Sequence, residues 1–344
     1  CCNGKKVTGS EACAYHDDMQ GPTAVISLPA LLQNAHALKD LAGVPLIAVV
    51  KDDAYGHGAE QVAHALERDV LMFAVATVEE GARLKIAGIG RDVLVLTPPS
   101  CQEDGMRAAA YGLIMTAASF VTLGLCRGRV HLAVNTGMNR YGFHPLETAR
   151  ACRAAQQRGL QVEGVFSHFY DAADREARRA QIAAFSDCVR IVRRNFPNAL
   201  RHLSATGGIL AGDARFDAVR PGIGLYGYAP DGFSCNLCPA MKVYADVLAS
   251  GAVFGGGAGY AHAPHGCKVF HTLGVGYGDG FFRNGGLGAV DTLCMDACVR
   301  QGRHSFGERV CVLENAQEYA SAYGTTAYEV LVSVGRGAWR VYER

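Results

Sequence analysis

The sequence lacks an excess of charge of either sign, because 33 lysine and arginine residues stand against 32 aspartate and glutamate residues in a chain of 344. This balance gives no electrostatic reason to expect nucleic acid or an acidic membrane surface as a partner. The sequence also lacks a long apolar run. The longest, at about residues 41–50, is far shorter than the ~20 residues needed to cross a bilayer. No apolar segment follows a basic stretch near the chain start, so we expect neither a membrane segment nor a secretory signal.

The cysteine pattern lacks the features of a disulfide or zinc framework. The chain has 13 cysteines, an odd number, and its 49 % apolar residues suffice for an ordinary globular core. We therefore interpret most cysteines as buried small apolar residues in a reducing compartment, which favours the cytoplasm. Cys235 and Cys238 form a C-x-x-C pair, but no second pair stands at a matching spacing, so we expect no metal site.

Short apolar, β-branched runs alternate with amphipathic stretches from about residue 21 to residue 230. The predicted strands are Pro45–Val50, Leu71–Thr77, Asp92–Thr97, Val130–Asn135, Val162–Ser167, His202–Ala205 and Ala218–Tyr226. Seven or eight strands that alternate with helices over ~210 residues are typical of a (β/α)8 barrel of the TIM type. A doubly wound open sheet is the alternative architecture.

Two of the helices can be placed from their first residues. Ser27 and Pro29 open one, and Asp174 opens the other. Their predicted apolar faces are Leu31, Ala35, Leu38 and Leu41 in the first, and Ile182, Phe185, Val189 and Val192 in the second. The second helix also carries arginines that we interpret as a solvated face: Arg175, Arg178, Arg179, Arg190, Arg193 and Arg194.

The character of the chain changes after about Ala240. Glycine becomes frequent, helical periodicity fades, and β-like runs follow at Val269–Val275, Val310–Leu313 and Val330–Val334. We predict an α/β barrel over residues 21–235 and a C-terminal, mostly β domain over residues 236–344, with residues 1–20 packing against the β domain.

One segment combines residues suited to covalent chemistry, Ile47-Ala-Val-Val-Lys51-Asp-Asp-Ala-Tyr55-Gly-His-Gly58. A lysine ends an apolar strand, and a glycine-rich turn follows it. Partial desolvation at such a position favours the neutral amine, which is the form that reacts with an aldehyde. Barrel active sites gather at these strand ends. On position alone, an ordinary surface lysine remains the alternative.

The same segment resembles the pyridoxal phosphate (PLP) lysine motif of the alanine racemase family, which belongs to the fold-type III PLP enzymes. The resemblance implies that Lys51 holds PLP and that Tyr55 contacts the PLP phosphate. The family commonly has Ala-Asn after the lysine, whereas this chain has Asp52 and Asp53, which changes the local charge near the cofactor.

A second segment, His131-Leu-Ala-Val-Asn135-Thr-Gly-Met-Asn-Arg140-Tyr-Gly-Phe143, resembles the family stretch D-T-G-M-x-R-x-G. The resemblance implies that Arg140 reaches the phenolic oxygen of PLP and the substrate carboxylate, which a bidentate guanidinium suits. Many members carry a lysine, often carbamylated, at the position of Ala133 and an aspartate at the position of Asn135. The usual anionic partner of Arg140 is therefore missing, and we expect a bound anion such as chloride, or a water network, in its place.

Segments that follow the later predicted strands also resemble the family, and some of them are expected to bind the PLP phosphate. Phe166-Ser-His168 matches the family's T-H-F, in which the histidine orients a catalytic tyrosine. In the run that starts at His202, the resemblance implies that the Thr206 hydroxyl and the backbone of Gly222 and Ile223 bind the phosphate.

Arg220 has a separate implied role. In the family this arginine lies against the pyridine nitrogen, and the residue at His202 supports it. An arginine stays protonated at any working pH, so it donates a hydrogen bond without giving up its proton. The unprotonated ring is then a weaker electron sink, which favours racemisation over transamination.

The β domain carries four further matches. Gly259-Tyr260-Ala261 resembles the S-Y-G element with the second catalytic base, and Gly276-Tyr277-Gly-Asp-Gly280 resembles G-Y-x-D-G. Cys294-Met295-Asp296 resembles the C/S-M-D element, and Tyr328-Glu329 resembles the pair whose tyrosine reaches the PLP phosphate and crowds the substrate. The resemblance implies that Tyr277, Met295 and Asp296 contact substrate. The gap from Tyr260 to Tyr277 is two residues shorter than the family spacing.

The resemblance implies an alanine racemase with two catalytic bases that supplies D-alanine for cell-wall peptidoglycan. Lys51 serves the D-enantiomer, and Tyr260, oriented by His168, serves the L-enantiomer. Because Tyr260 and Met295 act on the neighbouring subunit's PLP in the family, a head-to-tail homodimer with shared sites is expected.

Other functions remain open at this point. A serine or broad-specificity racemase is one, because Ala133 and Asn135 resemble those members, although the bulky Tyr328 favours alanine. Fold-type III decarboxylases share the architecture but fit the segment around Tyr55 less well. A non-catalytic PLP-binding barrel is the third, and such proteins lack the second domain that carries Tyr260.

Overall fold

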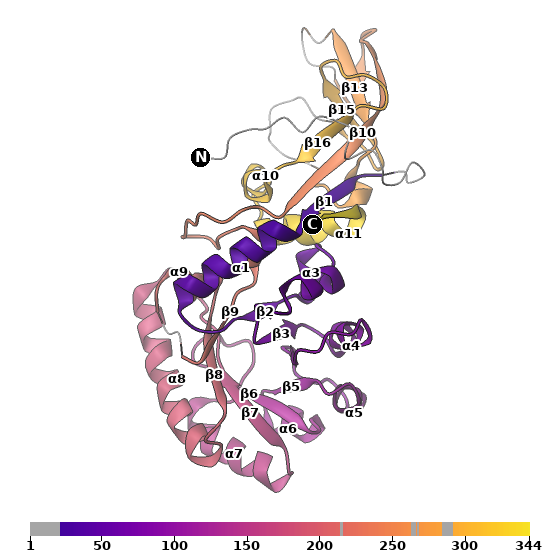
Figure 1. Cartoon of the computed structure of the whole chain (residues 1–344). Coiled ribbons are helices and arrows are strands. Elements are labelled where there is room, and N and C mark those ends of the chain that lie inside the picture. Colours follow the sequence, from indigo (N-terminus) through magenta and orange to yellow (C-terminus); the bar gives the residue numbers. More distant parts are fainter. Residues whose placement is uncertain (1–20, 214–215, 263–265, 267, 284–291) are drawn as a thin grey trace. The chain divides into compact units, whose positions relative to one another are not determined.

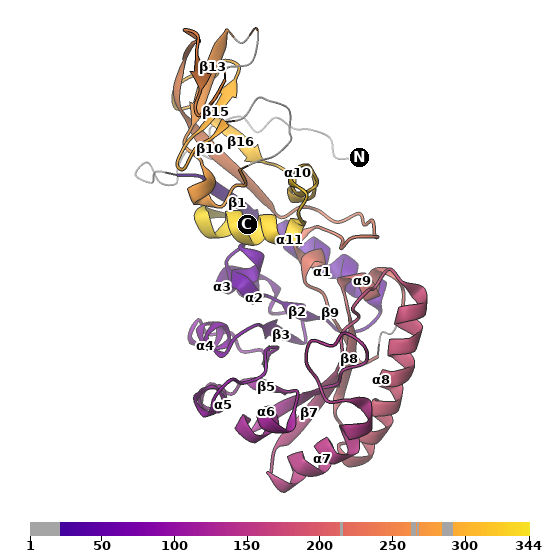
Figure 2. The same ribbon diagram turned by 180° about the vertical axis from the view of Figure 1, so that it is seen from behind.

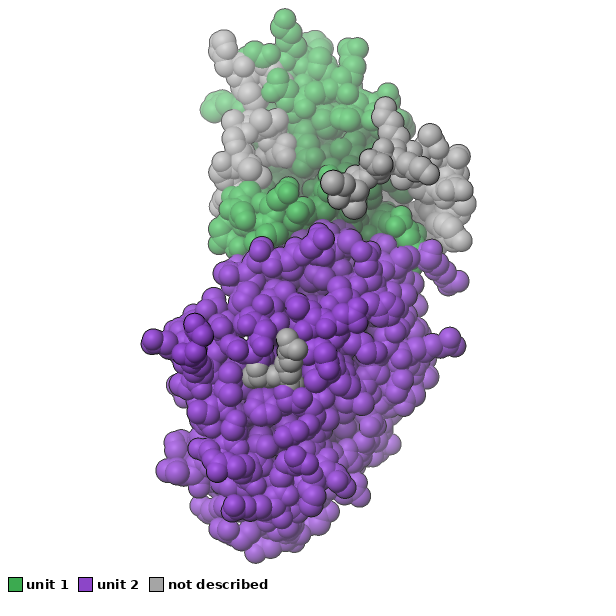
Figure 3. Space-filling view, turned by 60° about the vertical axis from the view of Figure 1, so that its left-hand side comes forward, with its two compact units in different colours: residues 1–26, 242–325, 333–343 green, residues 27–241, 326–332, 344 purple. Residues whose placement is uncertain are grey.

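The computed structural model describes residues 21–213, 216–262, 266, 268–283 and 292–344 (Figure 1). Two compact units make up this chain (Figure 3). The barrel unit contains Ser27–Met241 and Thr326–Val332, and the strand-rich unit contains the described residues up to Ile26, Lys242–Thr325 and Ser333–Glu343. The division predicted between residues 235 and 236 stays a prediction, and residues 1–20 lie outside the described residues.

Eight parallel strands form the barrel, in the same order in the sheet as in the sequence. They are β2 (Ile47–Val49), β3 (Met72–Val75), β4 (Val93–Val95), β5 (Ile114–Ala117), β6 (Arg129–Ala133), β7 (Gln161–Phe166), β8 (Leu200–Ala205) and β9 (Ala218–Arg220). A parallel bridge between Leu46 and Val219 joins the first strand to the last, and the Val49 N–H donates to the Pro221 carbonyl at 3.0 Å. The predicted (β/α)8 barrel is confirmed, because a doubly wound sheet would reverse its strand order.

Helices follow the strands around the outside of the barrel, as Figure 1 and the view from behind in Figure 2 show. They are α1 (Leu28–Ala42), α2 (Lys51–Tyr55), α3 (Ala59–Leu66), α4 (Val78–Ile86), α5 (Gln102–Ala110), α6 (Phe120–Leu125), α7 (Thr148–Gln157), α8 (Arg175–Asn195) and α9 (Thr206–Leu210), with 3-10 turns η2 (Pro145–Glu147) and η3 (Ile223–Tyr226).

The start signals of α1 and α8 act as the sequence predicts. The Ser27 hydroxyl accepts the Ala30 N–H at 3.4 Å, and the Asp174 carboxylate accepts the N–H groups of Glu176 and Ala177 at 2.8 and 3.1 Å. Each side chain satisfies donors of the first helical turn, which have no partner within the helix.

Two side chains on these helices differ from the prediction. Leu41 lies at the edge of the apolar face and is 45 % exposed. Arg178 is buried rather than solvated, because its guanidinium pairs with the Asp213 carboxylate at 2.8 Å and donates to the carbonyl of Ala172 at 2.6 Å. The charge pair and the carbonyl satisfy a guanidinium that burial would otherwise destabilise.

Two elements of the barrel also differ from the prediction. Strand β5 was not among the predicted strands, and its four-residue sequence Ile-Met-Thr-Ala has only one β-branched aliphatic residue, Ile114. The predicted strand Ala218–Tyr226 ends at Arg220, and η3 follows. Pro221 cannot donate to a strand ladder, which explains the break at that point.

The strand-rich unit is confirmed as mostly β. Its sheet has the order β14-β15-β13-β10-β1-β17, and β16 pairs with β10. The bounds are β1 (Thr23–Ser27), β10 (Met241–Ala252), β11 (Gly257–Ala258), β12 (Ala261–His262), β13 (Val269–Leu273), β14 (Thr292–Leu293), β15 (Cys298–Gln301), β16 (Arg309–Leu313) and β17 (Trp339–Glu343), with η4 (Tyr277–Asp279) and α10 (Ala316–Tyr323). The last helix, α11 (Ala327–Gly337), belongs to the barrel unit up to Val332 and to the strand-rich unit from Ser333.

The predicted strand Val330–Val334 is wrong, because these residues belong to helix α11. A reciprocal cap starts this helix: the Glu329 N–H donates to the Thr326 hydroxyl at 3.5 Å, and the Thr326 N–H donates to the Glu329 carboxylate at 3.4 Å. The T-x-x-E spacing and the buried Val330, Leu331 and Val334 at helical spacing outweigh the β-branched composition.

Among the described residues, none of the helices combines the length and apolarity that crossing a membrane requires. Nor does this part of the chain contain three or more His, Cys, Asp or Glu side chains grouped so that they could hold a metal ion.

Candidate active site

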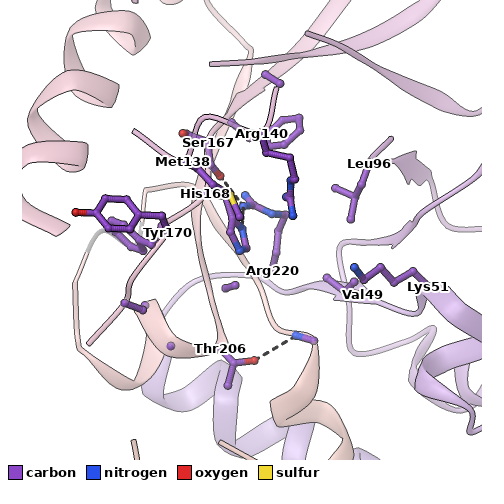
Figure 4. A pocket seen from close by; sticks show the side chains of 18 of the residues that line it. Val49, Lys51, Leu96, Met138, Arg140, Ser167, His168, Tyr170, Thr206 and Arg220 are labelled. Carbon is purple, nitrogen blue, oxygen red and sulfur yellow. Dashed lines mark hydrogen bonds between the residues drawn. The ribbon is translucent and has the colours of Figure 1, made fainter. Parts of the chain in front are cut away.

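A cavity of about 520 Å³ opens at the carboxyl ends of the barrel strands (Figure 4). Its lining comes from the residues that follow β2, β3, β4, β6, β7, β8 and β9, which is where barrel enzymes place their catalytic groups. Lys51, Arg140 and Arg220 contribute three cationic groups, and no aspartate or glutamate is among its described lining residues. The cavity therefore suits a ligand with more than one negative charge.

Lys51 reaches this cavity from a left-handed turn. Asp52, Asp53, Ala54 and Tyr55 all have φ between 52° and 55°. This region disfavours residues with a Cβ by roughly 1–2 kcal/mol each, so four in succession require support from their surroundings. The turn ends at Gly56, whose φ of 82° suits glycine.

The Glu80 carboxylate supplies part of that support. It accepts the Asp52 N–H at 2.6 Å, the Ala76 N–H at 2.7 Å and the Thr77 N–H at 3.1 Å. One side chain thus joins the turn after β2 to the turn after β3. Sequence reasoning missed this residue, although the spacing Thr77-x-x-Glu80 before an amphipathic run is a recognisable capping box.

Replacing Glu80 by alanine should lower the free energy of unfolding by about 2–4 kcal/mol, because three backbone donors lose a charged acceptor. Urea unfolding of the two proteins measures the difference. The matched control is Glu79→Ala, which removes exposed ion pairs to Arg83 and Arg107 and should cost less than about 1 kcal/mol. Equal losses in the two variants would contradict the proposed role of Glu80.

Tyr55 is a buried residue that lines the cavity. Its ring is 4.7 Å from the Tyr226 ring and 6.1 Å from the Tyr328 ring, between centroids. A Cβ at Gly222 would lie 2.5 Å from the Tyr55 hydroxyl, so the tyrosine can approach only a glycine there. Burial raises the pKa of Tyr55 above its ordinary value, which keeps the hydroxyl a neutral donor.

The Thr206 hydroxyl lies beside the same glycine-rich turn. It accepts the N–H groups of Gly222 and Gly224, each at 3.2 Å. Figure 4 shows one of these two hydrogen bonds at Thr206. Thr206, Gly222 and Ile223 all line the cavity, and their role in binding a phosphate stays a prediction.

Arg220 is buried, and its hydrogen-bond partners among the described residues are all neutral acceptors. Its guanidinium donates to His202 Nδ1 at 2.7 Å, to the Ser167 carbonyl at 2.6 Å, to the Leu203 carbonyl at 3.0 Å and to His168 Nδ1 at 3.2 Å. Burial lowers the pKa of Arg220 to about 10, so it remains a cation at neutral pH. Since a guanidinium can only donate, both imidazoles present a lone pair at Nδ1 and carry their proton at Nε2.

Three imidazoles lie near this arginine, of which His131 and His202 are buried and His168 is partly buried. Burial lowers the pKa of His131 and of His168 to about 3, and that of His202 well below its ordinary value. Nearby guanidinium groups, Arg129 and Arg220 for His131, act in the same direction. All three rings are therefore neutral over the physiological range.

These histidines should make the protein less stable in mild acid. Between pH ~6.5 and the folded-state pKa, the unfolded chain binds more protons, so stability rises with pH and falls as pH is lowered. Each ring contributes a slope of up to about 1.4 kcal/mol per pH unit. Denaturant unfolding at pH 6.5 and pH 5 measures it. His131→Asn should reduce the slope, whereas the exposed His64→Asn should leave it unchanged. An unchanged slope in both variants would exclude His131 as a source.

Arg140 also lines the cavity, but its surroundings differ from those of Arg220. Its guanidinium carbon lies 4.9 Å from the centre of the Tyr141 ring, and the Tyr141 hydroxyl donates to the Leu96 carbonyl at 3.2 Å. Ala133 belongs to an apolar cluster with Ala118 and Phe166. Within the described residues, no carboxylate lies at ion-pair distance from Arg140.

The Asn135 side chain is engaged within its own loop. Its amide oxygen accepts the N–H groups of Gly137 and Asn139 at 3.1 and 3.0 Å, and its amide nitrogen donates to the Asn139 side chain at 3.0 Å. The asparagine thus shapes the loop that carries Arg140.

The predicted residues of the strand-rich unit form a second group. Tyr260 lies in the two-residue turn between β11 and β12 and is 79 % exposed, and Met295 is 56 % exposed. The Arg283 guanidinium lies 5.9 Å from the Tyr260 ring centre and 5.7 Å from that of Tyr277. None of these side chains, nor Asp296, is among the residues that line the barrel cavity.

The chain around Tyr277 is held against Met295. The Tyr277 N–H donates to the Cys294 carbonyl at 3.0 Å, and the Gly278 N–H donates to the Met295 carbonyl at 2.8 Å. A Cβ at Gly276 would overlap the Met295 carbonyl oxygen, which explains the glycine. The structure therefore brings Tyr277 together with Met295 and Asp296.

Comparison with known proteins gives one consistent result. Residues 26–230 match the family model described as alanine racemase, N-terminal domain. The alanine racemase of Deinococcus deserti is 33 % identical over 92 % of this chain and 97 % of its own, and that of Deinococcus radiodurans is 36 % identical over 76 % and 78 %. The solved structure of alanine racemase from Clostridium difficile 630 has a TM-score of 0.86 at 28 % identity and covers 94 % of this chain and 96 % of its own.

The site geometry agrees with the cofactor of that family. PLP carries a phosphate, a phenolic oxygen and an aldehyde, and the cavity offers a lysine amine, two guanidinium groups and a glycine-lined turn that a Cβ at Gly222 would fill. The chain belongs to the alanine racemase family of PLP-dependent isomerases.

Proposed function

We propose that this protein interconverts L- and D-alanine with PLP held in the barrel cavity. The observation that carries the proposal is the set of three cationic side chains around a cavity whose described lining contains no carboxylate. PLP, when bound, supplies an electron sink that makes the Cα proton of an amino acid removable. The cationic lining favours the binding of a cofactor that carries a phosphate together with a substrate that carries a carboxylate.

In this proposal each lining group has one task. Lys51 holds the cofactor, while Tyr55, Tyr328, the Thr206 hydroxyl and the N–H groups of Gly222 and Ile223 face its phosphate. Arg220 would donate to the pyridine nitrogen of the bound cofactor, and His202 accepts from Arg220 at 2.7 Å. Because Arg220 keeps its own proton, it would not transfer that proton to the cofactor ring, which would favour return of the substrate proton to Cα.

Two bases on opposite faces of Cα move the proton. Lys51 takes or returns it on the D side, and the Tyr260 hydroxyl does so on the L side. The Nε2–H of His168 is available to orient that hydroxyl, because His168 Nδ1 already accepts from Arg220. Arg140 binds the substrate carboxylate, with Tyr277, Met295 and Asp296 at the substrate's entrance.

Tyr260 and Met295 are exposed on the strand-rich unit, so we propose that a second copy of the chain receives them in its cavity. The functional form is then a homodimer with shared active sites. We further propose that the enzyme works in the cytoplasm and supplies D-alanine for peptidoglycan.

Incubation of the PLP-loaded protein with L-alanine, and separately with L-serine, in D2O tests the function. NMR follows deuteration at Cα, and polarimetry follows the loss of optical rotation. We expect Cα deuteration and loss of optical rotation with alanine, and much weaker signals with serine. The reason is that the Tyr328 ring restricts the space for a larger side chain. A stronger response to serine would make the protein a serine-type racemase, and no exchange with either would leave a non-catalytic PLP-binding protein.

We also expect an anion beside Arg140. The guanidinium has no carboxylate partner among the described residues, and the side chain of Asn135 is occupied within its own loop. Crystals soaked in bromide should show an anomalous scattering peak next to this guanidinium. An Arg140→Met crystal is the control and should lack the peak. A map of the native protein without a peak there would favour the water network instead.

A further inference from the structure

A column of three buried side chains runs from the cavity into the barrel interior. Arg220 is the last residue of β9, His202 lies on β8 and His131 lies on β6. Arg220 donates to His202 Nδ1 at 2.7 Å, and His202 Nε2 lies 2.9 Å from His131 Nδ1. His131 does not line the cavity, and the racemase mechanism proposed above gives it no task.

The direction of both hydrogen bonds follows from elementary chemistry. A guanidinium has no lone pair to offer, so His202 Nδ1 must accept from Arg220. A neutral imidazole with an accepting Nδ1 carries its proton at Nε2. His202 therefore donates from Nε2, and His131 accepts at Nδ1. The column ends at His131 Nε2, which is buried and has no hydrogen-bond partner among the described residues.

Packing holds both rings in this alignment. The Phe166 ring stacks on the His202 ring at 5.1 Å between centroids and 9° between planes. His131 is paired in register with Gly164 on β7, where a Cβ would lie 2.6 Å from the His131 ring. The ring of His131 thus occupies space that only a glycine leaves open.

We propose that His131 is a positioning residue for Arg220: by accepting the Nε2–H of His202, it keeps the Nδ1 lone pair of that imidazole on the guanidinium. Without this acceptor, the polar edge of His202 is anchored at one end only, and its Nε2–H is buried without a partner. Rotation of the ring by a half turn then replaces Nδ1 with a carbon and removes one of the four acceptors of Arg220. The consequence for catalysis rests on the proposed function, in which Arg220 contacts the pyridine nitrogen.

The proton positions can be measured directly in the unmodified protein. Histidine labelled with 15N, in the protein with and without PLP, gives ring-nitrogen resonances that separate protonated from unprotonated nitrogen, and His202→Gln identifies the His202 signals by their loss. We expect His202 to be protonated at Nε2 with a slowly exchanging N–H, and His131 to be unprotonated at Nδ1. A proton on His202 Nδ1 would overturn the proposal, whatever reaction the protein catalyses.

Two variants of His131 then test the positioning role. His131→Leu removes the acceptor at similar volume, and His131→Asn keeps an oxygen near the place of Nδ1. In His131→Leu we expect rapid exchange of the His202 N–H and an about tenfold fall in kcat with KM within about twofold. In His131→Asn we expect slow exchange and a kcat within about threefold of the wild type.

The outcomes separate this inference from the proposed function. A slow His202 N–H that persists in His131→Leu would overturn the role of His131 even in an active racemase. Equal kcat values in the wild type and both variants would do the same. If the protein shows the expected 15N resonances but does not racemise alanine, the hydrogen-bonded column of Arg220, His202 and His131 is supported and the proposed function is refuted. If His131→Leu does not fold, the wild-type spectra and His131→Asn still decide the direction of the hydrogen bonds.

Discussion

Replacing Lys51 by alanine should reduce racemisation of alanine by at least about 10³-fold, because one residue supplies both the attachment of the cofactor and the base on the D side. The amine stands at the start of a left-handed turn that directs it into the cavity, and the described residues that line this cavity include no second lysine. Polarimetry with D-alanine and with L-alanine measures the loss in each direction.

The control for this variant is Lys39→Ala, on the exposed side of α1, which should retain full activity. Borohydride treatment of the PLP-loaded wild type, followed by peptide mapping, should locate the cofactor on Lys51. Cofactor fixed to another lysine, or activity retained by Lys51→Ala, would show that the strand-end lysine is not the attachment site.

Most of the barrel could be predicted because its strands are short apolar runs between helical stretches. Strand β5 could not, because Ile114–Ala117 carries one β-branched aliphatic residue and gains its place from its neighbours in the closed sheet. Helix α11 shows the opposite error. Its residues favour a strand locally, but the Thr326-x-x-Glu329 cap and one buried face override that preference.

The sequence motifs predicted the side chains that line the cavity better than the side chains that support the cavity without lining it. Lys51, Arg140, His168 and Arg220 each follow a strand, so their meeting in one cavity follows from the barrel itself. Glu80 has a local capping-box signal, but its bond to Asp52 depends on a turn that another strand brings near, and His131 likewise depends on a ring from another strand. The left-handed turn after Lys51 was equally hidden, since aspartate tolerates positive φ but Ala54 and Tyr55 give no hint of it.

Replacing Tyr260 by phenylalanine should lower Cα exchange of L-alanine by about 10²–10⁴-fold while exchange of D-alanine at Lys51 persists. Only the hydroxyl is lost, and the ring beside Arg283 remains. NMR in D2O with each enantiomer measures the asymmetry. The control is Tyr244→Phe, a partly buried tyrosine on β10 of the same unit. Unchanged exchange of L-alanine would mean that another group is the second base.

The same variant tests whether the sites are shared between subunits. Neither Lys51→Ala nor Tyr260→Phe chains alone should racemise alanine. In a mixed dimer, one site combines Lys51 of the Tyr260→Phe chain with the Tyr260 of its partner and is intact, while the other site carries both changes. When equal amounts of the two chains pair at random, half of the dimers are mixed, and each mixed dimer has one working site out of two. The mixture should therefore regain about a quarter of the wild-type activity. A mixture as inactive as its components would show that each site is built from a single chain.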